Sequence, residues 1–262
     1  MTFSQQQKPK DYASLSQKVY QYINQRSLTQ LAKEIFQNGI PLSRKLVGLY
    51  FDKRFDKKYN VDTCGAIHLE ELTIPDKSNI ESASIYDPAP ARTVKTLFSY
   101  LPNDLNNYTL VDFGSGKGRV MLVAAEYSFR KIIGVEFAKE LHEVTVENIA
   151  NYKSSQQKCF DIESVCADAA KFEIPEDNCI FYFFAPFKED VLSSVIENIK
   201  QSYQQAPRDM WILYITDPIT HPTSFNIIEN SGIFTEVRGE YCPFDIALRD
   251  SLYYKIYKTV GL

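Results

Sequence analysis

The sequence predicts an α/β fold: a doubly wound, mostly parallel seven-stranded sheet whose last strand pair is antiparallel, preceded by an N-terminal helical cap. Three observations lead to this prediction. After Pro90, short apolar runs alternate with stretches of helical character, which is typical of parallel sheets with right-handed crossovers. The last two runs are joined by a loop without a helix, which favours an antiparallel hairpin at one edge. Before residue 60, apolar residues recur at helical spacing.

The helical cap is predicted from this spacing. Residues 12–38 indicate one or two amphipathic helices, and residues 41–59 indicate another. The latter begins with Pro41, which is tolerated in the first turn of a helix. Residues 60–90 are rich in turn-forming residues and predict a connecting segment or a flap. We expect the cap and its connecting segment to cover residues 1–85.

Seven strands are predicted from short runs of apolar, β-branched and aromatic residues. In chain order, the runs cover residues 108–113, 131–137, 162–168, 179–184, 209–216, 233–240 and 251–259. Helical stretches separate the first five runs, for instance over residues 119–128, 138–152 and 188–204. We expect these elements to form one sheet domain over residues 86–262.

The composition is that of an ordinary globular protein. Of the 262 residues, 44% are hydrophobic and 24% are charged, and a chain of this length can bury a sizeable core. No stretch approaches the ~18 uncharged apolar residues of a membrane span, and the first residues lack the apolar core of a signal peptide. We therefore expect a cytoplasmic protein that does not interact with a membrane.

Charge is unevenly distributed along the chain. The net charge is −4, but residues 1–60 contain eleven basic and four acidic residues, so that segment carries +7 and the remainder −11. Such asymmetry is typical of a basic arm for an acidic partner, or of the solvated face of amphipathic helices. We favour the second interpretation, because the basic residues are interleaved with apolar ones.

Cysteine and histidine spacing predicts neither disulfides nor a metal site. The five cysteines are odd in number, widely spread and never in a C-x-x-C pair. Three of them lie beside apolar residues in predicted strands, which favours buried, reduced thiols. The three histidines are far apart and lack metal-ligand spacing.

The stretch VDFGSGKGRV places glycines at positions 114, 116 and 118, between the first predicted strand and the first crossover helix. Glycine costs about 0.5 to 1 kcal/mol relative to alanine inside regular structure, so three of them predict a backbone that turns sharply or approaches a ligand closely. A dinucleotide motif would need a third glycine at the position of Arg119. A phosphate-binding loop would need Ser or Thr after Lys117. Neither motif fits.

Residues 112–119, DFGSGKGR, resemble the first motif of the class I S-adenosylmethionine-dependent methyltransferases, a seven-strand, Rossmann-like family. The resemblance covers residues 86–260 and includes the second-strand stretch IIGVEF. It is to bacterial members whose acceptor is not characterised and, more distantly, to seven-strand protein lysine methyltransferases. It implies S-adenosylmethionine as the cofactor.

The resemblance assigns cofactor contacts to the ends of the first two strands. Glu136 would hold the ribose hydroxyls, since a carboxylate accepts two hydrogen bonds from a diol, and Phe137 would lie against the adenine. Asp112 would orient the glycine loop or meet the cofactor's ammonium. The loop itself, with Gly114, Ser115, Gly116 and Gly118, would approach the methionine end. The alternatives are that Glu136 is a surface carboxylate at a strand end and that the glycines form only a tight turn.

The third strand end adds Asp168 and Ala169. By resemblance, the Asp168 carboxylate and the Ala169 amide contact the adenine. The alternative is that Asp168 caps the helical stretch that follows it.

The fourth strand end is where the family often carries Asn or Asp before Pro and an aromatic residue, especially when the acceptor is an amine. Here the stretch is Ala185-Pro186-Phe187, so that polar side chain is missing. Phe183, Phe184 and Phe187 would form an apolar wall around the sulfonium or a lysine stem, since aromatic faces attract cations. For Phe183 and Phe184, the alternative is a place in the core.

Candidate catalytic residues precede the sheet domain. Tyr86 and Asp87 lie in SIYDPAPAR, which resembles the Tyr-x-Pro stretch that covers the methionine end of the cofactor in seven-strand protein lysine methyltransferases. With Phe187 they form the predicted catalytic group, Tyr86 and Asp87 being the candidate bases. The alternative is a turn held by Pro88 and Pro90.

The sequence therefore predicts a methyltransferase with an unidentified acceptor: a protein side chain first, a small molecule second and nucleic acid third, because the sheet domain is acidic and sustained positive potential is needed for phosphate binding. Two alternatives are a non-catalytic module that binds the cofactor and a nicotinamide oxidoreductase, which the glycine spacing disfavours.

Overall fold

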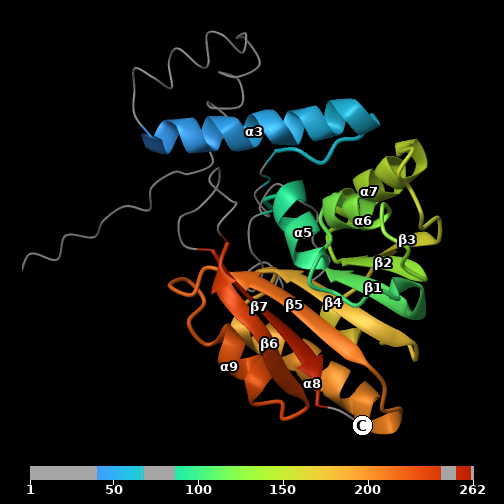
Figure 1. Cartoon of the computed structure of the whole chain (residues 1–262), viewed down its shortest axis with the longest axis vertical. Coiled ribbons are helices and arrows are strands. Elements are labelled where there is room, and N and C mark those ends of the chain that lie inside the picture. Colours follow the sequence, from blue (N-terminus) through green and yellow to red (C-terminus); the bar gives the residue numbers. More distant parts are fainter. Residues whose placement is uncertain (1–39, 66, 68–85, 243–251, 261–262) are drawn as a thin grey trace, which may run out of the picture.

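The computed structural model describes residues 40–65, 67, 86–242 and 252–260. In this part of the chain, seven strands form one sheet in the order β3-β2-β1-β4-β5-β7-β6. Figure 1 shows α5, α6 and α7 on one face of the sheet and α8 and α9 on the other, with α3 lying beyond the first group. The predicted α/β class is confirmed, as is the Rossmann-like fold that the resemblance implies.

The described elements follow the predicted alternation of strands and helices. The helices are α3 (Ile40–Tyr59), α5 (Ala91–Phe98), α6 (Arg119–Ala124), α7 (Lys139–Asn151), α8 (Glu189–Gln205) and α9 (Ser224–Glu229), with short 3-10 turns η2 (Leu105–Asn107) and η3 (Ala169–Lys171). The strands are β1 (Tyr108–Phe113), β2 (Lys131–Glu136), β3 (Ile162–Cys166), β4 (Asn178–Phe184), β5 (Met210–Thr216), β6 (Phe234–Tyr241) and β7 (Tyr253–Thr259). The helices predicted over residues 12–38 lie outside the described residues.

The order of the strands reverses at β1, which pairs in parallel with β2 on one side and with β4 on the other. Phe113, the last residue of β1, is in register with Val135 and Phe183, so the carboxyl ends of these three strands lie side by side. In open α/β sheets, ligands bind at this edge where the strand order reverses. The topology therefore places the predicted site residues at the favoured position.

The last strand pair is antiparallel, as predicted, and lies at one edge of the sheet. β7 pairs antiparallel with both β5 and β6, so it alone runs against the other strands. The internal position of β7 fits its fully buried Ile256 and Tyr257, whereas most residues of the edge strand β6 are exposed or half-buried.

Two apolar clusters pack against the two faces of the sheet. One includes Val94 of α5 and the whole of α6 beyond its first residue. The other includes side chains from α8 and α9, and it contains the stacked rings of Phe113 and Phe183, whose centroids lie 5.2 Å apart. Offset or stacked aromatic pairs add stability beyond their buried area. These layers make the sheet a rigid support for the loops at its carboxyl edge.

The prediction of buried thiols is wrong for Cys166, which is exposed. Its strand β3 is at the edge of the sheet, and none of the five residues of β3 is buried. Cys64, Cys159 and Cys179 are buried, and all five cysteines, which the structure describes, have free thiols.

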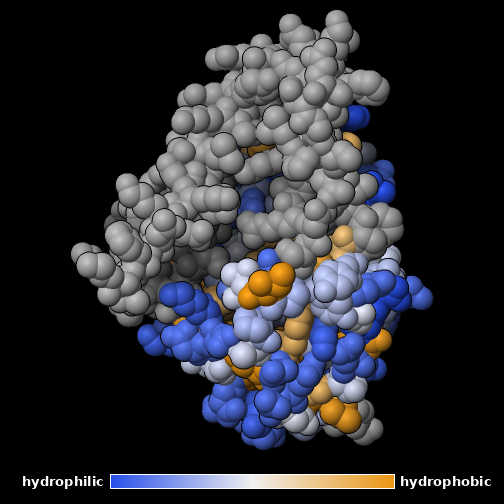
Figure 2. Space-filling view, turned by 90° about the vertical axis from the view of Figure 1, so that its left-hand side faces the viewer, coloured by the Kyte–Doolittle hydropathy of each residue, from blue (hydrophilic) through white to orange (hydrophobic). Residues whose placement is uncertain are grey.

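The described surface is largely polar. Figure 2 shows hydrophilic residues over much of the described part of one face, with hydrophobic residues scattered among them. The large apolar side chains that are exposed come from separate elements, for example Phe51 on α3, Phe160 before β3 and Ile219 after β5. Within the described residues, no helix is both long enough and apolar enough to cross a membrane.

Candidate functional site

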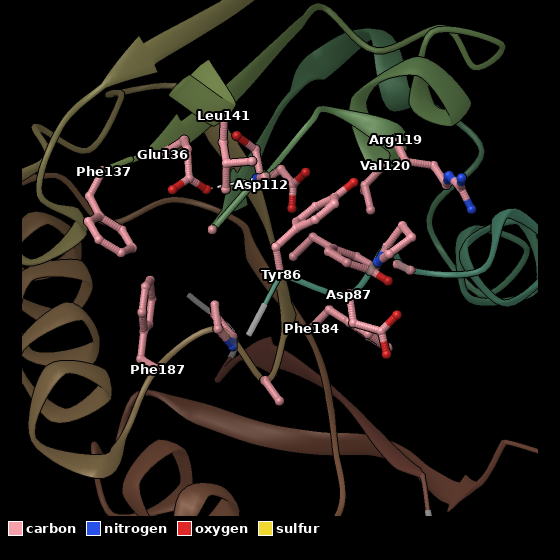
Figure 3. A pocket seen from close by; sticks show the side chains of 18 residues that line it. Tyr86, Asp87, Asp112, Arg119, Val120, Glu136, Phe137, Leu141, Phe184 and Phe187 are labelled. Carbon is pink, nitrogen blue, oxygen red and sulfur yellow. Dashed lines mark hydrogen bonds between the residues drawn. The ribbon is translucent and has the colours of Figure 1, made fainter. Parts of the chain in front are cut away.

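One pocket opens at the carboxyl ends of β1, β2 and β4 (Figure 3). It combines carboxylates, a glycine loop and aromatic rings. Its lining residues are Tyr86, Asp87, Pro88, Ala89, Asp112, Gly114, Ser115, Gly116, Arg119, Val120, Glu136, Phe137, Leu141, Tyr182, Phe184, Ala185, Pro186 and Phe187. Segments far apart in the sequence therefore meet in one concave site, and most residues predicted for cofactor binding and catalysis are among them.

The glycine loop has the conformation that its composition predicts. Gly114, Gly116 and Gly118 have φ angles of 72°, 55° and 82°, a region that residues with a Cβ rarely adopt. The amides of Gly114 and Ser115 both donate to the Val135 carbonyl, at 2.9 and 3.2 Å, which fixes the loop against β2.

Close contacts with neighbouring residues also explain why glycine is needed at these three positions. A Cβ on Gly114 would lie 2.5 Å from Cβ of Pro186, and a Cβ on Gly116 would lie 2.2 Å from Cε2 of Tyr86. Gly118 does not line the pocket: it caps α6, and a Cβ there would lie 2.7 Å from Cγ2 of Thr145. The glycines are thus needed both for the turn and for contacts made on either side of the loop.

Asp112 is the most unusual polar residue of the pocket. It lies in β1, is 2% exposed, and its Oδ2 has no hydrogen-bond partner among the described residues. Burial raises the pKa of Asp112 well above its ordinary value, and the nearby charge of Glu136 raises it further. A buried carboxylate oxygen without a partner is costly, so this site suits a ligand that brings a cationic hydrogen-bond donor.

Glu136 ends β2 and is held by the backbone. Its Oε2 accepts from the Gly116 amide at 2.8 Å, and its Oε1 accepts from the Ala138 amide at 2.9 Å. The residue is 3% exposed, and burial raises its pKa although these amides favour the charged form. The interpretation of Glu136 as a surface carboxylate is therefore wrong. Each oxygen retains acceptor capacity for a ligand hydroxyl.

Asp168 and Ala169 do not line the pocket. Asp168 caps η3, where its Oδ1 accepts from the Ala170 amide at 3.0 Å, and it also pairs with Lys171 at 3.0 Å. The capping interpretation is therefore observed. The assignment of Asp168 and Ala169 to adenine contact stays a prediction.

The end of β4 contributes an apolar and strained segment. Ala185 has a φ of 41° although it is not glycine, and its amide donates to the Ile215 carbonyl at 2.9 Å. Strained backbone of this kind is concentrated at functional sites. Phe184 and Phe187 line the pocket, whereas Phe183 is fully buried and belongs to the core. Figure 3 shows Phe137 and Phe187 facing one another on the same side of the pocket.

Tyr86 lies over the glycine loop. It forms an antiparallel bridge with Ile67, its ring contacts Gly116, and its hydroxyl donates to the Thr63 carbonyl at 2.8 Å. Burial raises the pKa of Tyr86 well above its ordinary value, so the phenol stays protonated at neutral pH. Tyr86 is thus suited to donate a hydrogen bond and to cover the loop, and Asp87 beside it also lines the pocket.

Sequence reasoning missed the role of the two cations in GKGR. Arg119 is 1% exposed and forms ion pairs with Asp52 and Asp56. Lys117 donates to Asp62 and to the Cys64 carbonyl, both at 3.0 Å. A signal was available: Asp52 and Asp56 are one helical turn apart in a segment with few acids.

Comparisons with known proteins give no match in sequence and several in fold. No protein-family profile and no curated protein matches this sequence. A protein from Pyrococcus horikoshii is 13% identical, with a TM-score of 0.48 over 73% of this chain and 96% of that one. A SAM-dependent methyltransferase from Leishmania major is 12% identical, with a TM-score of 0.47 over 65% and 71%. Magnesium protoporphyrin IX methyltransferase from Synechocystis, solved with bound SAM, is 14% identical, with a TM-score of 0.45 over 66% and 79%.

Proposed function

We propose that this chain is an S-adenosylmethionine-dependent methyltransferase. The observation that carries the proposal is the Oδ2 atom of Asp112, which is buried without a partner among the described residues, in the same pocket as Glu136 and directly before the glycine loop. A ligand that places an ammonium at Asp112 and a vicinal diol at Glu136 would satisfy both carboxylates. S-adenosylmethionine carries both groups.

The pocket residues fit the two ends of that cofactor. Asp112 would accept from the ammonium of its methionine part, a charge-assisted hydrogen bond that is stronger than a neutral one. Glu136 would accept from the ribose hydroxyls, and Phe137 would contact the adenine. The glycine loop lines the pocket, and Pro186 and the Tyr86 ring occupy the positions that side chains at 114 and 116 would take.

When bound, the cofactor supplies an electrophilic methyl group on a sulfonium. The chain's own contribution is to align the acceptor with that group and to exclude water. Phe184, Pro186 and Phe187 provide apolar walls for this purpose. Asp87 would take a proton from the acceptor, and the aromatic rings would stabilise a nearby cation.

For the acceptor we propose a protein side chain, with a small molecule as the second candidate. Support comes from Tyr86, whose ring covers the glycine loop in the manner that the Tyr-x-Pro resemblance implies. A non-catalytic cofactor-binding module is the alternative function, and Ala185 favours it, because no polar side chain stands at the end of β4.

Calorimetric titration with S-adenosylmethionine, S-adenosylhomocysteine and NAD tests the cofactor assignment. We expect micromolar binding of the first two, about −8 kcal/mol, and none of NAD. Asp112→Asn and Glu136→Gln should each weaken binding at least tenfold. Glu143→Gln is the matched control, because Glu143 is exposed on α7 and pairs with Lys139 away from the pocket. Binding of NAD alone, or equal binding by all variants, would refute the assignment.

Transfer of a labelled methyl group separates the remaining alternatives. We expect label in the protein fraction of a cell extract and loss of the signal in Asp87→Asn with cofactor affinity retained. Label only in the small-molecule fraction would favour the second acceptor class. Binding without any transfer would favour the non-catalytic module.

A further inference from the structure

The two cations of the glycine loop, Lys117 and Arg119, form ion pairs with acids in residues 52–62. Figure 3 shows the guanidinium of Arg119 directed outward from the pocket centre. It pairs with Asp52 and Asp56 of α3, and its Nε donates to Oγ1 of Thr63 at 2.8 Å. Arg119 thus joins the start of α6 to residues 52–64, which we call the cap segment.

Further hydrogen bonds fix the cap segment at its C-terminal end. Asp56 Oδ2 accepts from the amides of Thr63 and Cys64, at 2.9 and 2.8 Å. The Asp62 amide donates to the Asn148 side chain at 2.7 Å, and the Asn148 amide group donates back to the Asp62 carbonyl at 2.8 Å. The carbonyl of Thr63 is therefore held at a defined position relative to the sheet.

That carbonyl accepts the hydrogen bond from the Tyr86 hydroxyl at 2.8 Å. The Tyr86 ring in turn packs on Gly116 and lines the pocket. A continuous path of contacts therefore runs from Arg119 through Thr63 to Tyr86 and returns to the loop that carries Arg119. Each contact on this path is direct, and the path stays within the described residues.

We propose that Arg119 is a positioning residue: by holding the cap segment, it seats Tyr86 over the glycine loop and so completes the cofactor site. This inference rests on the proposed function, because the site it completes is the S-adenosylmethionine site. Arg119 itself touches neither cofactor nor acceptor in this scheme. A residue with only a structural role would also lie buried in such an ion pair, so the test must report on Tyr86.

A double-mutant cycle on S-adenosylhomocysteine affinity provides that report. Arg119→Lys keeps the positive charge but loses the planar fork that reaches two acids and Thr63 together. Tyr86→Phe keeps the ring and removes only the bond to the Thr63 carbonyl. We expect each single change to raise the dissociation constant of S-adenosylhomocysteine about tenfold. The dissociation constant of the double variant should lie within about twofold of that of the single variant that binds more weakly.

The control for the cycle is Arg130→Lys. Arg130 forms an ion pair with Asp177 between the starts of β2 and β4, at the opposite edge of the sheet from the pocket. It should leave the affinity unchanged and combine additively with Tyr86→Phe. If Arg119→Lys does not fold, Thr63→Val replaces it in the cycle, because it removes the hydroxyl that accepts from Arg119 while keeping the side-chain volume.

The outcomes separate this inference from the proposed function. Non-additive effects of Arg119→Lys and Tyr86→Phe support the positioning role. Additive effects, or an unchanged affinity in Arg119→Lys, overturn it while the proposed function stands. If the unaltered chain does not bind S-adenosylhomocysteine, the proposed function fails and the inference fails with it.

Discussion

At the scale of single residues, Asp112 imposes a cost on the fold that its neighbours do not relieve. One carboxylate oxygen is buried without a partner among the described residues, and Glu136 adds a second negative charge nearby. Proteins retain such costs at functional sites, where a bound ligand supplies the missing interaction.

Asp112→Asn should therefore stabilise the protein while impairing binding. We expect the free energy of unfolding at pH 7 to rise by about 1 to 3 kcal/mol, as measured by urea denaturation, because the amide cannot ionise and so carries no charge to be buried beside Glu136. Ser115→Ala serves as a comparison, because Ser115 also has a buried side-chain oxygen without a partner in the described part of the chain but carries no charge. A destabilised Asp112→Asn variant would contradict this account.

The raised pKa of Asp112 also predicts a pH dependence with a defined sign. The folded protein keeps the Asp112 proton at pH values where the unfolded chain, with a pKa of about 3.9, has lost it. The contribution of this residue to stability is therefore present below that value and is lost as pH rises toward the folded pKa. Binding of an ammonium ligand should release the proton.

Titrations of S-adenosylmethionine in buffers of different ionisation enthalpy measure that release. We expect proton release on binding and an affinity that increases with pH until Asp112 is ionised in the free protein. Both effects should disappear in Asp112→Asn. Proton uptake on binding would show that the carboxylate is not the ammonium site.

Gly116→Ala should both destabilise the protein and weaken cofactor binding. Its φ of 55° is unfavourable for alanine, and the new Cβ would displace the Tyr86 ring. Gly232→Ala isolates the effect of the positive φ, since Gly232 has a φ of 77° but no atom within 4 Å of the added Cβ. We expect a loss of about 1 to 2 kcal/mol in unfolding free energy for the control, a larger loss for Gly116→Ala, and weakened binding only for Gly116→Ala.

At the scale of elements, the connection from β4 to α8 stores strain next to the pocket. Ala185 adopts a φ of 41° immediately after the strand. The neighbouring Pro186 contacts Gly114, so the end of β4 is pressed against the glycine loop. Replacing Ala185 with glycine should relieve this backbone strain, because glycine adopts a positive φ without a steric cost.

Ala185→Gly should raise the free energy of unfolding by up to about 1 kcal/mol, because the relief of the positive φ exceeds the added entropy of the unfolded chain. Ala125→Gly should have the opposite effect, since Ala125 has an ordinary right-handed conformation at the end of α6. Urea denaturation of both variants measures the difference. A loss of stability in Ala185→Gly as large as in Ala125→Gly would show that Ala185 is not strained.

At the scale of the whole molecule, the pocket draws on the sheet, on the segment before it and, through Arg119, on α3. Cofactor binding should therefore stabilise the folded state as a unit. At 100 times its dissociation constant, S-adenosylhomocysteine should add about 2.7 kcal/mol, seen as a higher thermal midpoint. NAD at the same concentration should leave the midpoint unchanged, and an equal shift with NAD would contradict the assignment.

The sequence by itself determined the α/β class, the seven strands and the place of the glycine loop, because local periodicity and backbone preference depend on near neighbours. It also placed Asp112, Glu136 and the loop at adjacent strand ends, since parallel strands share one carboxyl edge. The division of the chain between residues 85 and 86 stays a prediction.

Only the tertiary structure decided which side chains are buried and which distant residues they contact. Position at the sheet edge exposes Cys166, packing across the sheet commits Phe183 to the core, and the fold brings Arg119 to acids more than 60 residues away in the chain. Neither the burial of a side chain nor its contact with a residue so far away in the chain leaves a periodic signal in the sequence, because both depend on how distant elements pack. Tyr86 reaches Gly116 for the same reason: the contact exists only once the cap segment and the sheet have come together.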